Sequence, residues 1–287
     1  MVSKTEYYAK MAWEASSHVT ESYEQWTGFL KTAGRIYKYS YNDQLMIHTQ
    51  RPDATACASY DIWNKRMNRY VKRGARGIVL LDTSGDFLRL HYVFDVSDTG
   101  TRKNSREVPV WHLNAENEPA VISSLARRFK LPDDLGRTEH YLAAISENLA
   151  ADYWEEHQEE LVDIVAQMGS GLYDRDAFRA GFLNAAASSI QYQTISRCFG
   201  NPDDFMSEAD FANLDLFSGP EIVNALGTAV NTGATQILRE IEAAIRNHER
   251  TRVKAQAEPE RSQNHDERTD LHPERGLSDS GHSTDRD

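Results

Sequence analysis

The chain has 287 residues, of which 40% are hydrophobic, and a formal net charge of −12, which suits one large domain or two ordinary ones. It contains no run of 18 apolar residues, and its first residues lack the apolar core of a signal peptide, so we expect neither a membrane span nor secretion. Two isolated cysteines without a CxxC pair favour reduced thiols in a cytoplasmic protein and argue against a zinc site.

The first part of the chain predicts helices separated by short breaks. Residues 4–37 predict one helix, because apolar residues recur at three- and four-residue spacing. Asn42 is expected to cap a short helix that Pro52 ends, since proline cannot donate to the preceding turn. Ser59 is expected to cap a further helix that reaches about Asn68.

Strand patterns follow. Residues 78–81 form a short apolar run that predicts a buried strand, and residues 88–96 alternate, with the apolar side chains at the even positions. Residues 97–107 predict a loop, and residues 108–112 predict another strand. We therefore expect residues 1–115 to form an α+β domain, with a small antiparallel sheet and helices packed on one face.

Helical periods replace the strand patterns after Pro119. Residues 116–249 predict an all-helical region, and no repeat of 20–50 residues is visible. Residues 250–287 contain few large apolar side chains, so we expect a disordered linker or tail. The predicted fold class is α+β, followed by the helical region and this tail.

Charge is distributed unevenly along the chain. Residues 31–110 carry a net charge of +6, whereas residues 111–250 carry −13. Within the first block, residues 31–76 hold ten lysines and arginines and only three acids. Cations neutralise phosphates, rings stack on unpaired bases, and amides bond to base edges, so this block predicts a groove for single-stranded nucleic acid. Aromatic and amide side chains lie among the cations: Tyr37, Tyr39, Tyr41, Asn42, Gln44, Gln50, Tyr60, Trp63, Asn64, Asn68 and Tyr70.

The strongest cationic feature is a turn with Lys72, Arg73 and Arg76 beside Gly74 and Gly77. Small residues let a phosphate approach the backbone while the cations neutralise it. The alternative is a solvated turn that merely precedes a strand. The turn is not a phosphate-binding P-loop, because the required GxxxxGK[ST] string is absent.

Each ring and amide in this block has a structural alternative. Tyr39, Tyr41 and Trp63 are candidate stacking platforms, but aromatic residues also build cores. Asn42 can cap a helix, and Gln44 and Gln50 can fix a helix end instead of meeting base edges. The predicted nucleic-acid contacts are Tyr39, Tyr41, Asn42, Gln44, Gln50, Arg51, Trp63, Lys65, Arg69, Lys72, Arg73 and Arg76.

The sequence shows no catalytic constellation, so we expect no enzyme activity, no cofactor and no metal site. Five acids between residues 155 and 163, with His157 among them, share helix faces at four-residue spacing, but a solvated acidic face explains them. The sequence contains no recognisable Ser/His/Asp or Cys/His catalytic motif.

Several spaced positions give the basic block a family resemblance. They are Asn42, Leu45, Ile47, Gln50 and Pro52 in one helix end, the pair Ala54 and Thr55, then Trp63, and Val71, Lys72, Gly74, Gly77 and Ile78. Over residues 10–115 the chain resembles the N-terminal single-stranded-DNA-binding domain of the ArdC antirestriction family. The family usually has a glycine three residues before this valine, where the chain has Asn68, so the local turn can differ.

The resemblance implies binding of single-stranded DNA by a protein of a plasmid or conjugative element. Residues 116–249 look like the helical region that follows this domain in very large helicase- or methylase-like proteins of such elements. ArdC itself continues into a metalloprotease-like domain with a His-Glu-x-x-His zinc motif. Here His248 and Glu249 are followed by no second histidine at the required spacing, so that protease motif is missing.

Two functions follow as hypotheses. The first is a non-catalytic module that binds single-stranded DNA without sequence preference, in conjugation or antirestriction, with single-stranded DNA and DNA-processing proteins as partners. The alternative is an acidic anti-defence protein, in which the acidic helical region mimics nucleic acid and inhibits a host nuclease.

Overall fold

Two serine-capped helices open the chain. The computed structural model describes residues 3–85, 87–168 and 174–266. Helix α1 is Lys4–His18 and helix α2 is Tyr23–Arg35, so the single helix predicted over residues 4–37 is wrong. The break has a local cause, because the Ser22 hydroxyl accepts a hydrogen bond from the Gln25 N–H at 3.2 Å and starts a new helix.

Helix α3, Tyr41–Gln50, is also capped by a serine. The Ser40 hydroxyl accepts from the Asp43 N–H at 3.2 Å, so Ser40 takes the capping role predicted for Asn42. The helix ends before Pro52, as the sequence predicts.

A three-stranded antiparallel sheet follows, with the order β1-β4-β3. Its strands are β1, Cys57–Ser59, β3, Ile78–Asp82, and β4, Arg89–Asp95, so both predicted strands are confirmed. Ile78 lies opposite Val93, and these side chains join a small core with Ile47 from α3.

The buried face of β4 differs from the predicted one. The sequence places the core at the even positions, but Val93 and Asp95 are buried while Tyr92 is 39% exposed. Val93 shares a face with Ile78, and the core side chains of α3 pack there, so tertiary packing overrides the alternation.

A second, two-stranded sheet was not predicted. Strand β2, Arg69–Val71, pairs with β5, Thr99–Thr101, inside the segment predicted as a loop. The short helix η2, Val96–Asp98, precedes β5. The helix predicted up to Asn68 is a five-residue π-helix, η1, Ile62–Arg66. The strand predicted over residues 108–112 does not form, and that segment is irregular.

The region after residue 116 is helical, as predicted. Its long helices are α4, Glu118–Phe129, α5, Thr138–Gln167, α6, Arg175–Phe199, and α7, Pro220–Asp266. Three short 3-10 helices lie between α6 and α7: η3, Pro202–Asp204, η4, Glu208–Phe211, and η5, Leu214–Leu216.

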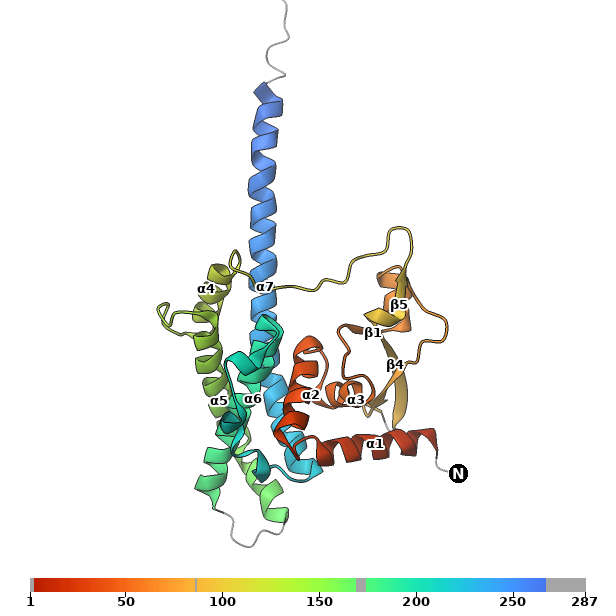
Figure 1. Cartoon of the computed structure of the whole chain (residues 1–287), viewed down its shortest axis with the longest axis vertical. Coiled ribbons are helices and arrows are strands. Elements are labelled where there is room, and N and C mark those ends of the chain that lie inside the picture. Colours follow the sequence, from red (N-terminus) through yellow and green to blue (C-terminus); the bar gives the residue numbers. More distant parts are fainter. Residues whose placement is uncertain (1–2, 86, 169–173, 267–287) are drawn as a thin grey trace, which may run out of the picture. The chain divides into compact units, whose positions relative to one another are not determined.

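One core joins the amino-terminal helices to this helical region. Trp26 of α2 is fully buried, and its indole N–H donates to the Ser189 hydroxyl of α6 at 2.8 Å. Tyr41 of α3 lies against Gly227 of α7, where a Cβ would overlap the tyrosine ring. In Figure 1, α2 lies between the strand-bearing part and helices α5 and α6.

Residues 1–245 form one compact unit and residues 246–287 another. The boundary expected at residue 115 therefore does not separate two units, whereas the boundary expected at residue 249 lies near the observed one. Helix α7 includes the first part of the segment predicted to be disordered, and residues 267–287 lie outside the described residues. Among the described residues, no helix is both long and apolar enough to cross a membrane.

Candidate nucleic-acid interface

The two-stranded sheet gathers cations from two parts of the sequence. Tyr70 of β2 pairs with Gly100 of β5, and hydrogen bonds tie the flanking segments together. The Arg106 N–H donates to the Met67 carbonyl, and the Asn68 side chain donates to the Lys103 carbonyl, both at 2.9 Å. We call the resulting set of nine cations the basic ribbon: Lys65, Arg66, Arg69, Lys72, Arg73, Arg76, Arg102, Lys103 and Arg106.

The basic ribbon is largely open to solvent, since all its members except the half-buried Arg69 are exposed. Lys65 pairs with Asp61 at 3.2 Å in an exposed ion pair, which stabilises little and leaves the ammonium accessible. Lys72 donates to the Ser97 carbonyl at 2.8 Å. Within the described residues, five members form no ion pair and remain available to phosphates: Arg66, Arg73, Arg76, Lys103 and Arg106.

An exposed aromatic ring lies among these cations. Tyr70 is 43% exposed, and its ring lies across Gly100, where any Cβ would overlap it. The Arg102 guanidinium lies 5.6 Å from the centre of this ring and donates to the Arg69 carbonyl at 2.9 Å. Such a ring can stack on an unpaired base while the neighbouring cations neutralise its phosphates.

Two further exposed apolar side chains lie near the basic ribbon. Tyr60, which precedes helix η1, is 56% exposed, and Ile62, the first residue of η1, is 39% exposed. Asn64 of the same helix accepts a hydrogen bond from Arg102 at 2.9 Å, which fixes η1 to the end of β5.

The rings predicted to stack are placed differently. Tyr41 and Trp63 are buried, and Trp63 donates its indole N–H to the Phe94 carbonyl at 2.8 Å, so the prediction of base stacking is wrong for both. Tyr39 is half-buried and donates to the Cys57 carbonyl at 2.8 Å. Burial raises the pKa of Tyr39, as expected for a hydroxyl held inside the fold.

The two predicted glutamines serve the fold. Gln44 is fully buried, and its amide donates to Asn231 at 2.8 Å, so it cannot meet a base edge. Gln50 donates to the Val79 carbonyl at 2.8 Å and accepts from the Val79 N–H at 2.9 Å. Its amide therefore continues the hydrogen bonding of β3 on the edge that β4 does not occupy.

Two further predicted contacts also lie apart from the basic ribbon. Asn42 is exposed but lines a pocket of about 510 Å³ together with Asp43 and Asp82, whose carboxylates repel phosphate. Arg51 is bound to Asp53 and Asp98, both at 3.0 Å, and is therefore a structural cation.

The structure thus brings together five of the predicted contacts: Lys65, Arg69, Lys72, Arg73 and Arg76. Sequence reasoning missed Arg102, Lys103 and Arg106, because nothing in their local pattern reveals that β5 pairs with β2. The exposure of Tyr70 could have been predicted had β2 been recognised as a strand. Successive side chains of a strand point to opposite faces, so the Tyr70 ring points away from the face of Arg69 and Val71.

The two cysteine thiols and the clusters of possible metal ligands were the remaining reactive groups to consider. Burial raises the pKa of the Cys57 thiol to about 12, and that of Cys198 to about 12 as well, so both stay protonated and are weak nucleophiles. In the part of the chain that the structure describes, no cluster of three or more His, Cys, Asp or Glu side chains could hold a metal ion.

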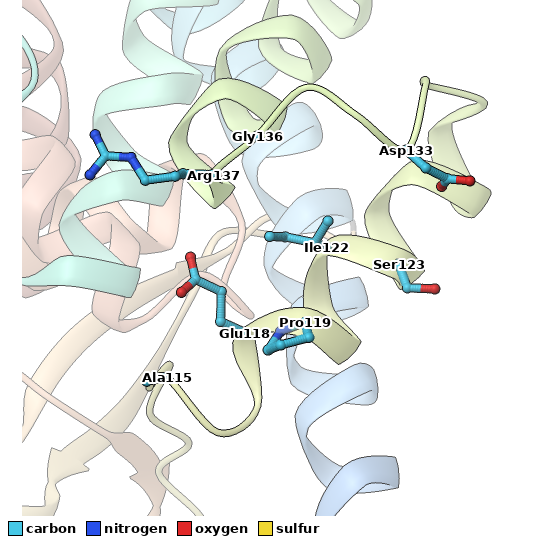
Figure 2. A pocket seen from close by; sticks show the side chains of 8 residues that line it. All are labelled: Ala115, Glu118, Pro119, Ile122, Ser123, Asp133, Gly136 and Arg137. Atoms are coloured by element: carbon cyan, nitrogen blue, oxygen red, sulfur yellow. The ribbon is translucent and has the colours of Figure 1, made fainter.

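A pocket of about 520 Å³ lies between the start of α4 and the α4–α5 connection (Figure 2). Its lining includes Glu118, which accepts from the Thr138 hydroxyl at 2.8 Å, and Arg137, which pairs with Glu139 at 2.6 Å. Glu118 and Arg137 are already engaged, and the remaining charged group of the described lining is the exposed Asp133.

No family model matches the chain, and comparison with curated proteins and with solved structures found no match. Its relation to the ArdC family therefore stays a prediction from the sequence.

Proposed function

We propose that this protein binds single-stranded DNA through the basic ribbon, without strong sequence preference and without catalysing a reaction. The observation that carries the proposal is the exposed Tyr70 ring beside Arg102, on a two-stranded sheet flanked by the cations of the basic ribbon. Phosphate contacts carry no sequence information, and every base offers a face for stacking, so the same surface accepts any sequence.

Paired and unpaired strands should be distinguished by the ring. A base in a duplex has both faces covered by its neighbours, whereas an unpaired base can stack on Tyr70 and gain about 1–3 kcal/mol. The cations also contribute affinity that falls as the salt concentration rises. In a plot of log affinity against log salt concentration, each phosphate neutralised on a single strand makes the negative slope steeper by roughly 0.7.

The biological setting follows from the sequence resemblance. We propose that the protein acts in a plasmid or conjugative element, where it protects or delivers a transferred single strand and counters restriction. DNA-processing proteins are the expected partners in that setting.

Fluorescence anisotropy with single- and double-stranded oligonucleotides at two salt concentrations tests the proposal. The variant Arg73→Ala with Arg76→Ala should weaken binding to all single strands alike and reduce the salt slope. The matched control is Arg127→Ala with Arg128→Ala on α4, which removes the same charge from exposed positions outside the basic ribbon. Equal affinities for both double variants would exclude the basic ribbon as the binding surface.

The ring is tested separately from the charges. Tyr70→Ala should weaken binding to single strands by about 5- to 150-fold, the equivalent of 1–3 kcal/mol, whereas Tyr70→Phe should retain most of the affinity. Tyr7→Ala, at a tyrosine of α1 that is 55% exposed, is the control. A protein that binds no oligonucleotide but inhibits a nuclease would instead favour mimicry by the acidic region.

A further inference from the structure

A third pocket lies between the α2–α3 connection, strand β1, the end of α6 and the irregular segment 108–112. Its volume is about 400 Å³, within the range of small-molecule sites. The described lining includes Arg35, Lys38 and Arg197 but no carboxylate. The pocket shares no residue with the basic ribbon, so it is a separate feature.

The two arginines are cations without an ion-pair partner. Arg197 lies 3.6 Å from the centre of the Trp111 ring and donates to the Trp111 carbonyl at 2.8 Å. Arg35 donates to the carbonyls of Ala54 and Pro52. Both side chains are half-buried, and neither forms an ion pair among the described residues. Burial lowers the pKa of each guanidinium, and the attraction of Asp53 and Asp95 for Arg35, and of Glu242 for Arg197, offsets this loss of water only in part.

Lys38, the third cation of the lining, is already neutralised. It pairs with Glu242 at 2.9 Å, and the same carboxylate accepts from the Tyr37 hydroxyl. Partly buried charges are normally paired, so the unpaired guanidiniums of Arg35 and Arg197 mark a place where an anion is favoured.

The lining also contains apolar side chains, and one of them is exposed. It contains Val108, Pro109, Val110 and Ile36, and Val110 is 52% exposed. Trp111 is almost fully buried, with its indole N–H bonded to the Tyr37 hydroxyl at 3.2 Å, so the wall beside Arg197 is fixed. A ligand that fits both the cations and the apolar side chains needs an anionic group and a flat apolar body.

We propose that this pocket binds one nucleotide, with its phosphate at Arg35 and Arg197 and its base against the apolar wall of residues 108–111. Guanidinium groups match phosphate oxygens through paired hydrogen bonds, and about 400 Å³ suits a nucleoside monophosphate. The nucleotide is either free in solution or the terminal unit of a bound strand, and both present the same chemistry.

Magnetic resonance can locate the binding, because the chain has five tryptophans with distinct indole N–H groups. Titration with thymidine 5′-monophosphate should shift the Trp111 signal, assigned with Trp111→Phe, and leave the signal of Trp154 in the helical core unchanged. Thymidine and inorganic phosphate at the same concentrations should each shift it far less. No shift with the monophosphate, or an equal shift with phosphate alone, would overturn the proposal.

A variant at the exposed edge avoids damage to the core. Val110→Glu places a carboxylate beside the site and should weaken monophosphate binding by at least about tenfold, through repulsion of the phosphate. Val253→Glu, at a valine that is 62% exposed, is the matched control and should bind like the unmodified protein. Equal affinity of Val110→Glu and Val253→Glu would refute the site.

Competition separates the two sources of the nucleotide. A 5′-phosphorylated single strand that displaces the monophosphate indicates a strand end, whereas undiminished monophosphate binding indicates a free nucleotide. The variant Arg73→Ala with Arg76→Ala should leave monophosphate binding unchanged. Monophosphate binding in a protein that binds no oligonucleotide would support the pocket and reject the proposed function. Oligonucleotide binding in a protein that binds no monophosphate would support the proposed function and reject the pocket.

Discussion

Amide side chains take over backbone roles at two places in this molecule. Gln50 exchanges two hydrogen bonds with Val79, at 2.8 and 2.9 Å, in the manner of a neighbouring strand. Gln44 joins the turn before α3 to Asn231 of α7. The sequence marks both residues as polar side chains of a basic block, but their partners lie 29 and 187 positions away. Their structural role could therefore not be predicted locally.

Gln50→Glu should destabilise the protein by about 1–3 kcal/mol, because the carboxylate cannot donate to the Val79 carbonyl. Urea denaturation measures the loss. Gln25→Glu, at an exposed position in the first turn of α2, is the control and should cost nothing. A midpoint for Gln50→Glu equal to that of the unmodified protein would show that these two bonds contribute no net stability.

The predictability of the site also depends on individual residues. The cations at positions 65–76 were found because charge is visible in the sequence. The stacking rings were misassigned, because Tyr41 and Trp63, like Tyr70, lie among cations and amides in the sequence. The three rings differ in burial, which the sequence does not display. Burial depends on what packs above each ring: helix α7, from the far end of the chain, covers Tyr41, whereas Trp63 lies against the strands and donates to the Phe94 carbonyl.

At the scale of elements, the long helices and the apolar strand β3 were predictable, since periodicity is a local signal. Strands β2 and β5 have three residues each and contain no alternating apolar pattern. Their pairing depends on contacts 28–32 residues apart, which a single sequence does not display. The same limit hid the arginines beyond β5.

Asp95 links β4 to the turn before β1 and to helix η2. It is 2% exposed, and it accepts from the N–H groups of Thr55, Ala56 and Ser97 at 2.7, 3.0 and 2.9 Å. Burial by itself would raise the pKa of Asp95, but these bonds and the one from the Ser97 hydroxyl outweigh it and hold the pKa below its ordinary value.

A depressed pKa in the folded state means that Asp95 stabilises the protein above its ordinary pKa, near 3.9, and loses this contribution as the pH falls through the folded value. Asp95→Asn should therefore cost about 1–3 kcal/mol at pH 7, and the difference from the unmodified protein should shrink below about pH 4. Denaturation curves from pH 7 to pH 2.5 measure it, with the exposed Asp133→Asn as control. A difference that stays constant with pH would contradict the assignment.

Helices α2 and α6 approach closely at a glycine. A Cβ on Gly34 would lie 2.8 Å from the Gln193 carbonyl oxygen, which belongs to the backbone and cannot move aside cheaply. Gly34→Ala should therefore destabilise the protein by about 1–3 kcal/mol. Gly28→Ala in the same helix has no atom within 4 Å of the new Cβ, and should stabilise by up to about 1 kcal/mol. Thermal denaturation that ranks the two variants in the opposite order would reject this packing argument.

At the scale of the whole molecule, the amino-terminal part encloses only a small core of its own, and its large rings pack into the core of the helical region. Trp26, Phe29 and Tyr41 belong to the same cluster as the buried residues of α5, α6 and α7. The boundary predicted at residue 115 rested on a change from strand to helix patterns, which marks a change of element type and not a division of the core.

A fragment of residues 1–115 should therefore fail to fold by itself, since it would expose these rings to water. Its amide spectrum should be poorly dispersed, and its unfolding should lack cooperativity. Residues 1–245 should behave as one cooperative unit. Cooperative unfolding of the short fragment would contradict a shared core, and recovery of structure on mixing it with residues 116–250 would support one.

The contact between Tyr41 and Gly227 has a consequence for heredity. Recombination can exchange segments between related genes, and a crossover near codon 115 would combine one parent's ring with the other parent's helix. Any enlargement at position 227 would then collide with the aromatic side chain. Viable hybrids should thus inherit both segments from the same parent, and these two positions should vary in concert across descendants.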